Sequence, residues 1–442
     1  MDISFKKEYD DIFVLLESHH NWFKYSLPLV ASENITSTAV REALATDLGN
    51  RYAEGWPGER VYAGCKYIDE IELKCMELAK NLFNADFVDV RPISGVCANL
   101  SIYSEFTDPG DCIITLSIPN GGHISSGKKE FHGTAGLVHG LMVDYFAFDR
   151  DEMNIDVDKT KIKFERLLRD ENKKLKLAMF GGSLFLFPHP LKELSDFFHS
   201  HDVLICYDSA HVSGLIAGGQ FQDPLREGAD FVTLSTHKTL FGPQGGIILS
   251  SSQYGERIKE AVFPGNTSNH HLHSVAAKAV AFAEMHQFGN DYAKQVIKNA
   301  KALAQNLVEQ GIVILGEKNG FTESHQIALD ITKYGDGGIL EKSLEDANII
   351  TNRQIIPGDI KSGRNYKNPG GLRIGTSEIT RLGMKENDMG KVAEFISRVI
   401  IKKESSLNII KELKEFRKEF QQICYSFESK DIAYNYIRMR GS

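Results

Sequence analysis

Residues 230–246 read Asp-Phe-Val-Thr-Leu-Ser-Thr-His-Lys-Thr-Leu-Phe-Gly-Pro-Gln-Gly-Gly. The apolar run at the start predicts a buried strand, which delivers His237 and Lys238 to a turn rich in glycine and proline. Burying an ammonium group costs free energy unless the group is paired or loses its charge. Lys238 is therefore either a strand end that emerges into solvent or a nucleophile whose lowered pKa suits it to form a Schiff base.

Length and composition limit the classes of protein to consider. With 442 residues, 42% of them hydrophobic and 25% charged, the chain is typical of a soluble globular protein of two domains. A net charge of −8 argues against a nucleic acid or an anionic membrane as partner. No apolar run approaches the roughly 20 residues that cross a bilayer, and the charged N-terminus does not resemble a signal peptide.

The cysteines and histidines give no sign of a metal site. Six cysteines are scattered without a CxxC pair, which indicates reduced thiols and predicts a cytoplasmic protein. His270, His271 and His273 form a cluster, but adjacent histidines are poorly placed to chelate one ion together. We therefore expect no metal and assign the cluster to a loop or an interface.

Strands and helices alternate through the first 260 residues. Short apolar segments predict seven strands, at residues 87–90, 112–116, 141–146, 175–180, 203–207, 231–234 and 246–250. Helices are expected before, between and after them, at residues 67–83, 96–103, 158–169, 191–201 and 254–262. This alternation predicts an α/β fold with a mostly parallel seven-stranded sheet, and the near-continuously apolar strands indicate that both faces are covered.

The pattern changes after about residue 275. A long helical region at 274–310, interrupted near Gly289, leads to a mixture of short strands and helices that predicts a smaller α+β domain. Residues 405–427 have the apolar spacing of an amphipathic helix that packs on its own protein. We expect an N-terminal arm (1–50) with a helix at 9–23, a large domain (51–275), a small C-terminal domain (276–400) and a C-terminal helical extension (401–442).

Asp208 gives Lys238 a chemical context. It follows the apolar segment 203–207 directly, so its carboxylate is expected at the carboxyl edge of a buried strand, where open α/β sheets place ligands. Pyridoxal phosphate requires a lysine that holds its aldehyde and an aspartate that keeps its ring nitrogen protonated. An aspartate that caps the next helix at the surface is the alternative.

Four further residues, in three segments, could complete such a site. Ser94 and Gly95 open a predicted helix, whose first N–H groups could bind a phosphate, although such turns are also common between ordinary strands and helices. His123, on a loop after segment 112–116, could lie over a planar ring or simply be solvated. Arg373 stands within an apolar strand, where a buried guanidinium demands a substrate carboxylate or a structural ion pair.

Together these segments resemble the serine hydroxymethyltransferase family of pyridoxal-phosphate enzymes, which have the aspartate-aminotransferase fold (fold type I). The matching segments are Leu29-Val-Ala-Ser-Glu-Asn34, Tyr52-Ala-Glu-Gly-Trp-Pro-Gly58, Gly64-Cys-Lys-Tyr-Ile-Asp-Glu-Ile-Glu72, Gly121-Gly-His123, Asp208-Ser-Ala-His211, Ser235-Thr-His-Lys238 and Gly371-Leu-Arg-Ile-Gly-Thr376. Residues 181–190 and 268–273 look closer to the archaeal branch. Val61 stands where the family often has a second tyrosine, next to the pterin's aryl ring in the folate enzymes.

The resemblance implies a role for each matching residue. Lys238 would form the internal aldimine with pyridoxal phosphate and His237 would help to position it. The other cofactor-binding residues would be Asp208 at the ring nitrogen, His123 on the ring, His211 near O3′, and Ser94 and Gly95 at the phosphate. Ser32 and Arg373 would hold the carboxylate of the amino acid. Glu54 would be the acid/base at the serine hydroxyl, and Tyr52 and Tyr62 would reach in from the neighbouring subunit of a homodimer with its sites at the interface.

The implied reaction is hydroxymethyl transfer from serine to tetrahydrofolate or tetrahydromethanopterin. Retro-aldol cleavage would leave a glycine quinonoid, and the products would be glycine and a methylene-tetrahydropterin. The alternative is a pterin-independent threonine aldolase or transaldolase of specialised biosynthesis. A non-catalytic or RNA-binding protein is disfavoured by the acidic composition and by the set of Lys238, Asp208 and His123.

Overall fold

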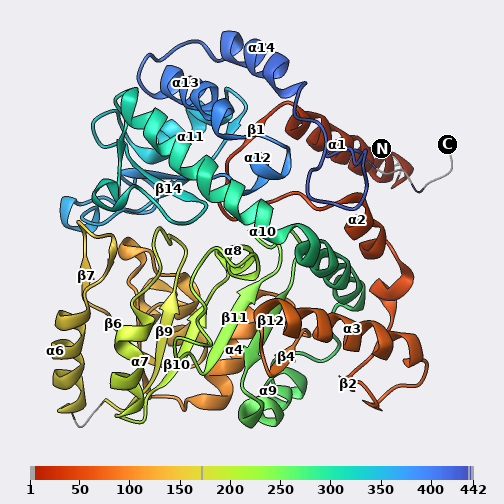
Figure 1. The fold of residues 1–442 in the computed structure, drawn as a ribbon, viewed down its shortest axis with the longest axis vertical. Coiled ribbons are helices and arrows are strands. Elements are labelled where there is room, and N and C mark those ends of the chain that lie inside the picture. The colour runs from red at the N-terminus through yellow and green to blue at the C-terminus, as the bar shows by residue number, and fades with distance from the viewer. Residues whose placement is uncertain (1–4, 171–172, 437–438, 440–442) are drawn as a thin grey trace.

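The computed structural model describes residues 5–170, 173–436 and 439. Its largest element is a seven-stranded sheet with the order β4-β12-β11-β10-β9-β5-β6 (Figure 1). These strands are β4 (Phe87–Asp89), β5 (Cys112–Thr115), β6 (Met142–Tyr145), β9 (Leu175–Gly181), β10 (Leu204–Asp208), β11 (Phe231–Ser235) and β12 (Gly246–Ser250). β12 runs antiparallel to both of its neighbours and the remaining pairs are parallel, so the predicted mostly parallel sheet is confirmed.

Alternate side chains of each strand enter different hydrophobic cores, which explains the continuously apolar strands. On one face Ile113, Leu177 and Phe231 pack with α4 (Gly95–Phe106) and α9 (Gly255–Glu260). On the other face Ile114 and Val232 belong to a larger core. Helices that cover that face are α3 (Lys66–Phe83), α6 (Val157–Leu168), α7 (Leu191–His199), α8 (Ser213–Ala217) and the first half of α10 (Leu272–Glu309).

The C-terminal part of the chain, which lies above the large sheet in Figure 1, has a hydrophobic core of its own. It is built on the antiparallel sheet β13-β14-β17-β16, whose strands are Val313–Ile314, Gln326–Asp330, Gly371–Gly375 and Asn352–Gln354. The helices around it are α11 (Gly337–Glu345), α12 (Ser377–Arg381), α13 (Met389–Ile400) and the second half of α10. β1 (Leu27–Pro28) pairs with β15 (Ile349–Ile350), so part of the predicted N-terminal arm packs against this core.

The predicted interruption near Gly289 is wrong, because α10 is a continuous helix of 38 residues. A side chain at Gly218 would lie 2.4 Å from the carbonyl oxygen of Gly289, so the two backbones pass in very close contact. Gly289 therefore serves helix packing instead of ending the helix. The expected domain boundary at 275/276 falls within α10, so the limits of the two domains remain a proposal.

The predicted C-terminal helix is too long. α14 covers Ser406–Arg417, and the buried Arg417 donates hydrogen bonds to the carbonyl oxygens of Ser26 and Phe420. Farther on, the backbone N–H groups of Ile423 and Cys424 donate to Asp431 and Arg381 instead of continuing a helix. Tertiary contacts thus override the local apolar spacing, although Phe420 and Ile423 are buried as that spacing predicts.

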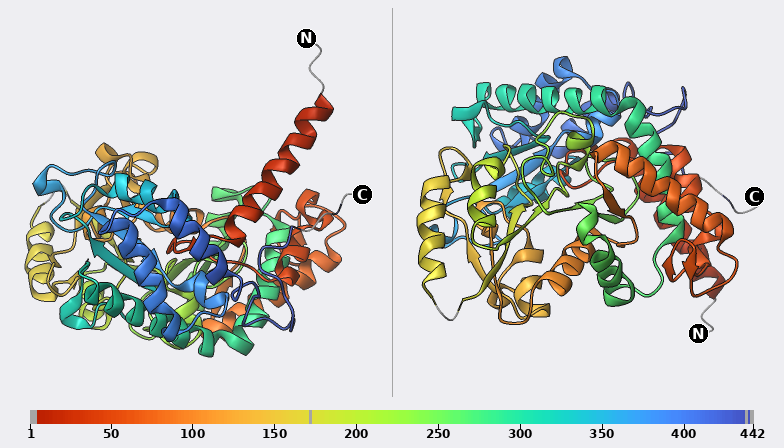
Figure 2. Two further views of the ribbon diagram at one scale, coloured as in Figure 1. Left: turned by 90° about the horizontal axis from the view of Figure 1, so that it is seen from above. Right: turned by 60° about the horizontal axis from the view of Figure 1, so that its bottom comes forward.

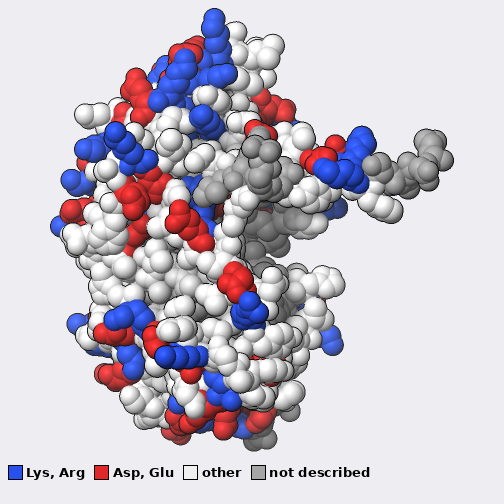
Figure 3. Space-filling model, turned by 90° about the vertical axis from the view of Figure 1, so that its right-hand side faces the viewer, with Lys and Arg blue, Asp and Glu red and all other residues white. Residues whose placement is uncertain are grey.

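Two features of the exterior bear on function. The helix α1 (Phe5–Lys24) projects from the body of the molecule (Figure 2) and exposes apolar side chains, including Phe5, Ile12, Val14 and Leu15. On the face drawn in Figure 3, lysine and arginine side chains lie among aspartate and glutamate side chains instead of forming one large basic area. Among the described residues, none of the helices is both long and apolar enough to cross a membrane.

Candidate active site

A cavity of about 190 Å³ lies where β10, β11 and the start of α4 meet. Asp208 and Ser235 are the last residues of the two strands, and Ser94 immediately precedes the helix. The cavity is lined by Ser94, Gly95, Val96, Asn99, His123, Gly182, Asp208, Ala210, His211, Ser235, His237 and Lys238. The structure therefore brings together every residue that the sequence assigned to the cofactor.

Lys238 is buried in this cavity. Its Nζ lies 3.4 Å from Ser235 Oγ and, in the described part of the chain, forms no ion pair with Asp208. Burial lowers the pKa of Lys238 to about 8, with a further contribution from Arg373, while Asp208 opposes the change. Because the pKa is close to neutral, a substantial fraction of the amine is uncharged and nucleophilic near pH 8.

This pKa leads to a prediction about the binding of pyridoxal phosphate to the cofactor-free protein. The rate constant for imine formation at Lys238 is expected to rise with pH and to level off above about pH 8, since the neutral amine is the reactive form. Stopped-flow absorbance at a series of pH values measures this rate. A rate that keeps rising up to the ordinary lysine pKa of about 10.4 would contradict the lowered pKa.

The carboxylate of Asp208 is held in place by hydrogen bonds. The backbone N–H of Ala210 donates to Oδ1 (3.0 Å) and Asn99 Nδ2 donates to Oδ2 (2.8 Å). Asn99 is oriented in turn by Thr233, whose hydroxyl donates to Asn99 Oδ1 (2.6 Å). The sequence analysis missed Asn99, although a polar residue within the apolar helix at 96–103 was a usable signal.

The start of α4 offers backbone donors to an anion. Ser94 caps the helix through its hydroxyl, which accepts from the backbone N–H of Cys97 (3.2 Å). A Cβ at Gly95 would lie 2.5 Å from Ser235 Oγ, so a larger residue here would displace the hydroxyl that Lys238 contacts. The N–H groups at the start of a helix bind phosphate groups well.

The histidines of the cavity are neutral. Burial lowers the pKa of His123, and burial followed by the charge of Lys238 lowers the pKa of His237 to about 4. The backbone N–H of Ser125 donates to His123 Nδ1 (3.1 Å), which fixes the orientation of the ring. Uncharged rings in fixed orientations suit contact with a planar aromatic ligand.

Arg373, on β17, is buried next to this group. It donates to Asn352 Oδ1 (3.2 Å) and to the carbonyl oxygen of Ser183, and no carboxylate of the described residues pairs with it. Burial lowers its pKa to about 10, so the guanidinium remains charged at neutral pH. Among the described residues Arg373 therefore has no structural ion pair, and its charge is available to an external anion. Ser32 is half-buried in a turn. The preceding residue, Ala31, packs against Gly375, which lies on β17 like Arg373.

Tyr52, Glu54 and Tyr62 lie outside the cavity. The two tyrosine rings are 5.2 Å apart and about half exposed, and the hydroxyl of Ser268 donates to the carboxylate of Glu54. Within a single chain these residues do not reach Lys238. The exposure of the two tyrosines is what the resemblance implies for residues that reach in from a neighbouring subunit.

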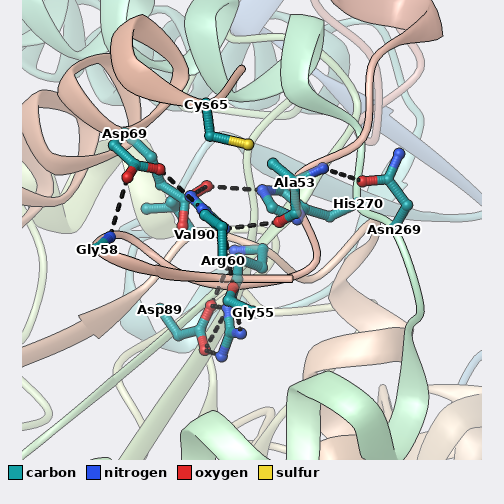
Figure 4. A network of polar contacts seen from close by, with 12 residues as sticks. Ala53, Gly55, Gly58, Arg60, Cys65, Asp69, Asp89, Val90, Asn269 and His270 are labelled. Atoms are coloured by element: carbon teal, nitrogen blue, oxygen red, sulfur yellow. Dashed lines mark hydrogen bonds and ion pairs between the residues drawn. The ribbon is translucent and has the colours of Figure 1, made fainter. Parts of the chain in front are cut away.

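The loop that carries Glu54 is nevertheless fixed (Figure 4). Arg60 Nη1 donates to the carbonyl oxygens of Ala53 (2.7 Å) and Gly55 (2.8 Å), one on each side of Glu54. The backbone N–H of Ala53 donates to Asn269 Oδ1 (2.9 Å). The backbone around Glu54 is thus held from two directions, while its side chain remains accessible.

A buried ionic network lies behind Arg60. Its guanidinium contacts Asp69 (2.8 Å) and Glu72 (3.0 Å), and Glu72 accepts from His270 Nε2 (2.7 Å). Burial favours the neutral acid, but His270 and Arg60 outweigh it and lower the pKa of Glu72. His270 is therefore part of this network, and no group of three or more His, Cys, Asp and Glu side chains could hold a metal within the described ranges.

Arg60→Ala is expected to lower the free energy of unfolding by about 3 kcal/mol, because it leaves Glu72 buried without its partner. Urea unfolding followed by circular dichroism measures the change. Arg51→Ala is the matched control, since Arg51 pairs with Asp47 in an exposed ion pair whose loss costs less than about 1 kcal/mol. If both variants lost the same free energy of unfolding, the buried network would stabilise the fold no more than an exposed ion pair does.

Comparison with known proteins supplies the observation that decides the family. The family model for serine hydroxymethyltransferase matches residues 5–396. The chain is 61% identical to serine hydroxymethyltransferase from Nitrosopumilus maritimus, over 98% of this chain and 99% of that protein. The chain belongs to the serine hydroxymethyltransferase family. It is also 50% identical to the serine hydroxymethyltransferase of Methanocaldococcus jannaschii, with 98% and 99% of the two chains covered.

A solved structure supports the fold and the cofactor. L-threonine transaldolase from Pseudomonas fluorescens, in its internal aldimine state, superimposes with a TM-score of 0.84 and 30% sequence identity. The match covers 96% of this chain and 94% of that chain. This member of the serine hydroxymethyltransferase family therefore has the predicted fold type I and is a pyridoxal-phosphate enzyme. The buried amine of Lys238, the carboxylate of Asp208 and the backbone N–H groups at the start of α4 fit that cofactor.

Proposed function

We propose that this chain transfers the hydroxymethyl group of serine to a tetrahydropterin, giving glycine and a methylene-tetrahydropterin. The observation that carries the proposal is the buried Arg373, which lacks a carboxylate partner among the described residues and lowers the pKa of Lys238. An unpaired guanidinium beside a nucleophilic amine selects a substrate that carries a carboxylate, as an amino acid does. Small molecules are thus the expected partners of this site.

Each residue that faces the cofactor has a defined task in this proposal. Lys238 would supply the neutral amine that holds pyridoxal phosphate, and His237 would help to position it. Asp208 would keep the ring nitrogen protonated, and His123 would contact the ring. Ser94 and Gly95, at the start of α4, would hold the phosphate. When bound, pyridoxal phosphate supplies an electron-accepting ring that stabilises the negative charge left at Cα when the Cα–Cβ bond breaks.

The substrate and its protons are handled by a second set of residues. Ser32 and Arg373 hold the carboxylate of serine, which orients the bond to be broken. Glu54 accepts the proton of the serine hydroxyl as formaldehyde is released and returns it in the reverse direction. Tyr52 and Tyr62 orient Glu54 and the substrate by hydrogen bonding.

The proposed assembly is a homodimer in which each chain contributes Tyr52, Glu54 and Tyr62 to the cavity of its partner. Two observations support it: these three side chains lie outside the cavity of their own chain, and α1 exposes apolar side chains that a second copy could cover. A rigid loop with an accessible carboxylate suits catalysis across an interface.

Turnover of serine by the cofactor-loaded protein tests the reaction. Glycine formation is measured without a pterin, with tetrahydrofolate and with tetrahydromethanopterin. Transfer that depends on a pterin supports the proposal and also identifies the carrier. The choice of carrier is open because Val61 replaces the tyrosine that the family often has next to the pterin's aryl ring. Aldehyde transfer from serine or threonine at the same rate without any pterin would favour the aldolase or transaldolase alternative.

A further inference from the structure

Gln326 is a fully buried side chain at the start of β14, where the C-terminal part of the chain meets the cavity. The backbone N–H of Phe185 donates to its Oε1 (2.6 Å), and its Nε2 donates to the carbonyl oxygen of Ser183 (3.0 Å). If the oxygen and nitrogen of this amide were exchanged, the N–H of Phe185 would face the amide NH₂ group, and the carbonyl oxygen of Ser183 would face the amide oxygen. Neither pair could form a hydrogen bond. The two backbone groups therefore fix the orientation of the amide.

The amide nitrogen of Gln326 also contacts His211, because Nε2 lies 2.8 Å from His211 Nδ1. Nε2 can only donate, so Nδ1 of His211 must accept this hydrogen bond and carries no proton. A neutral imidazole whose Nδ1 is unprotonated carries its proton on Nε2. The hydrogen-bond pattern around Gln326 thus determines the tautomer of His211.

The charges around His211 keep its ring neutral. Burial holds the pKa of His211 well below its usual value, and the positive charges of Lys238 and Arg373 lower it further. His325, which immediately precedes β14, and His123 lower the pKa of His211 as well. An imidazolium would also need a proton on Nδ1, where it would meet the N–H of Gln326.

We propose that Gln326 is a positioning residue that fixes His211 as the Nε2–H tautomer, so that His211 presents a hydrogen-bond donor to the cavity. The identity of the acceptor rests on the proposed function: it is the phenolic oxygen of pyridoxal phosphate, whose anionic form a donor stabilises. The carbonyl oxygen of Ser183 accepts from both Gln326 and Arg373, so the same loop also orients the guanidinium.

The tautomer can be read by NMR on protein labelled with ¹⁵N in histidine and glutamine. The nitrogen shifts of His211, assigned with a His211→Asn variant, are recorded from pH 5 to 9 with and without pyridoxal phosphate. We expect an unprotonated Nδ1 and a protonated Nε2 throughout, and a coupling across the hydrogen bond between Gln326 Nε2 and His211 Nδ1. None of these readouts requires turnover, so the result stands whether or not the proposed reaction is found.

Gln326→Glu tests the cause. A carboxylate would place an acceptor opposite Nδ1, so the proton is expected to move onto Nδ1 and His211 to titrate within this pH range. The matched control is Gln354→Glu, because Gln354 is a buried glutamine on β16 whose amide donates to the carbonyl oxygen of Ile355 instead of to a histidine. It should leave the His211 signals unchanged.

Three results would overturn the proposal. They are a protonated Nδ1 in the unsubstituted protein, the absence of the coupling across the hydrogen bond, and an unchanged tautomer in folded Gln326→Glu. If Gln326→Glu does not fold, the first two measurements still decide, because they use the unsubstituted chain. A purely structural role for Gln326 would change stability and leave the position of the proton untouched.

Discussion

Lys238→Ala is expected to lower kcat for serine cleavage by at least about a thousandfold, the order of loss seen when a covalent nucleophile is removed. The variant should also lose the visible absorbance band of the loaded protein. The reason is that the cavity offers one buried amine, with a pKa of about 8, to the aldehyde of pyridoxal phosphate. Steady-state glycine formation and an absorbance spectrum measure the two effects.

The control for Lys238→Ala is rescue by a small primary amine. If the side chain acts only as an amine, added methylamine should restore part of the activity and of the absorbance. Borohydride reduction followed by peptide mapping gives an independent check, since the unsubstituted protein should carry the label on Lys238. An unsubstituted protein labelled at another lysine would contradict this assignment.

Arg373→Ala is expected to reduce kcat/KM for serine by about a hundred- to a thousandfold. Truncating one member of a buried, charged pair costs about 2–5 kcal/mol, and in the complex the substrate carboxylate is that partner. The loss should appear mainly as a higher KM, because the carboxylate contact is present both before and during bond cleavage. Initial rates over a range of serine concentrations measure it.

Two comparisons separate binding of the carboxylate from damage to the fold. Arg353→Ala, on the neighbouring strand, removes a half-exposed arginine that pairs with Glu341 and should change kcat/KM little. A substrate without a carboxylate should lose little from Arg373→Ala. Equal losses for serine and for that substrate would show that Arg373 does not bind the carboxylate.

The sequence predicted the parts of the site that follow local rules. Asp208 directly follows an apolar run, and such runs end at the edge of the sheet where ligands bind. Lys238 also follows an apolar run. Its role could be inferred because pyridoxal phosphate needs both a lysine and an aspartate, and Asp208 supplies the second. The seven strands were recognised because each is a short apolar segment between polar turns. A strand that is buried on both faces has a continuous apolar run instead of an alternation of apolar and polar residues.

The sequence could not show what depends on contacts between distant segments. Asn99 and Gln326 orient Asp208 and His211 from elements that are 109 and 115 residues away along the chain. Neither belongs to a motif. The position of Glu54 outside the cavity of its own chain was equally hidden, because the local sequence does not say which cavity a loop faces. The helix at 405–427 was overestimated because Arg417 redirects the chain through tertiary hydrogen bonds.

The continuous helix α10 has a consequence for how this family can vary. Near its start, Lys278 donates to the carbonyl oxygen of Val90 (2.6 Å), directly after the end of β4. Toward its end, Asn299 donates to Thr380 (2.8 Å), which follows the strand of Arg373. One inserted or deleted residue between them would turn one half of the helix by about 100° relative to the other. A change of length in this segment would therefore have to be absorbed locally, for example by a π-bulge, to keep both contacts.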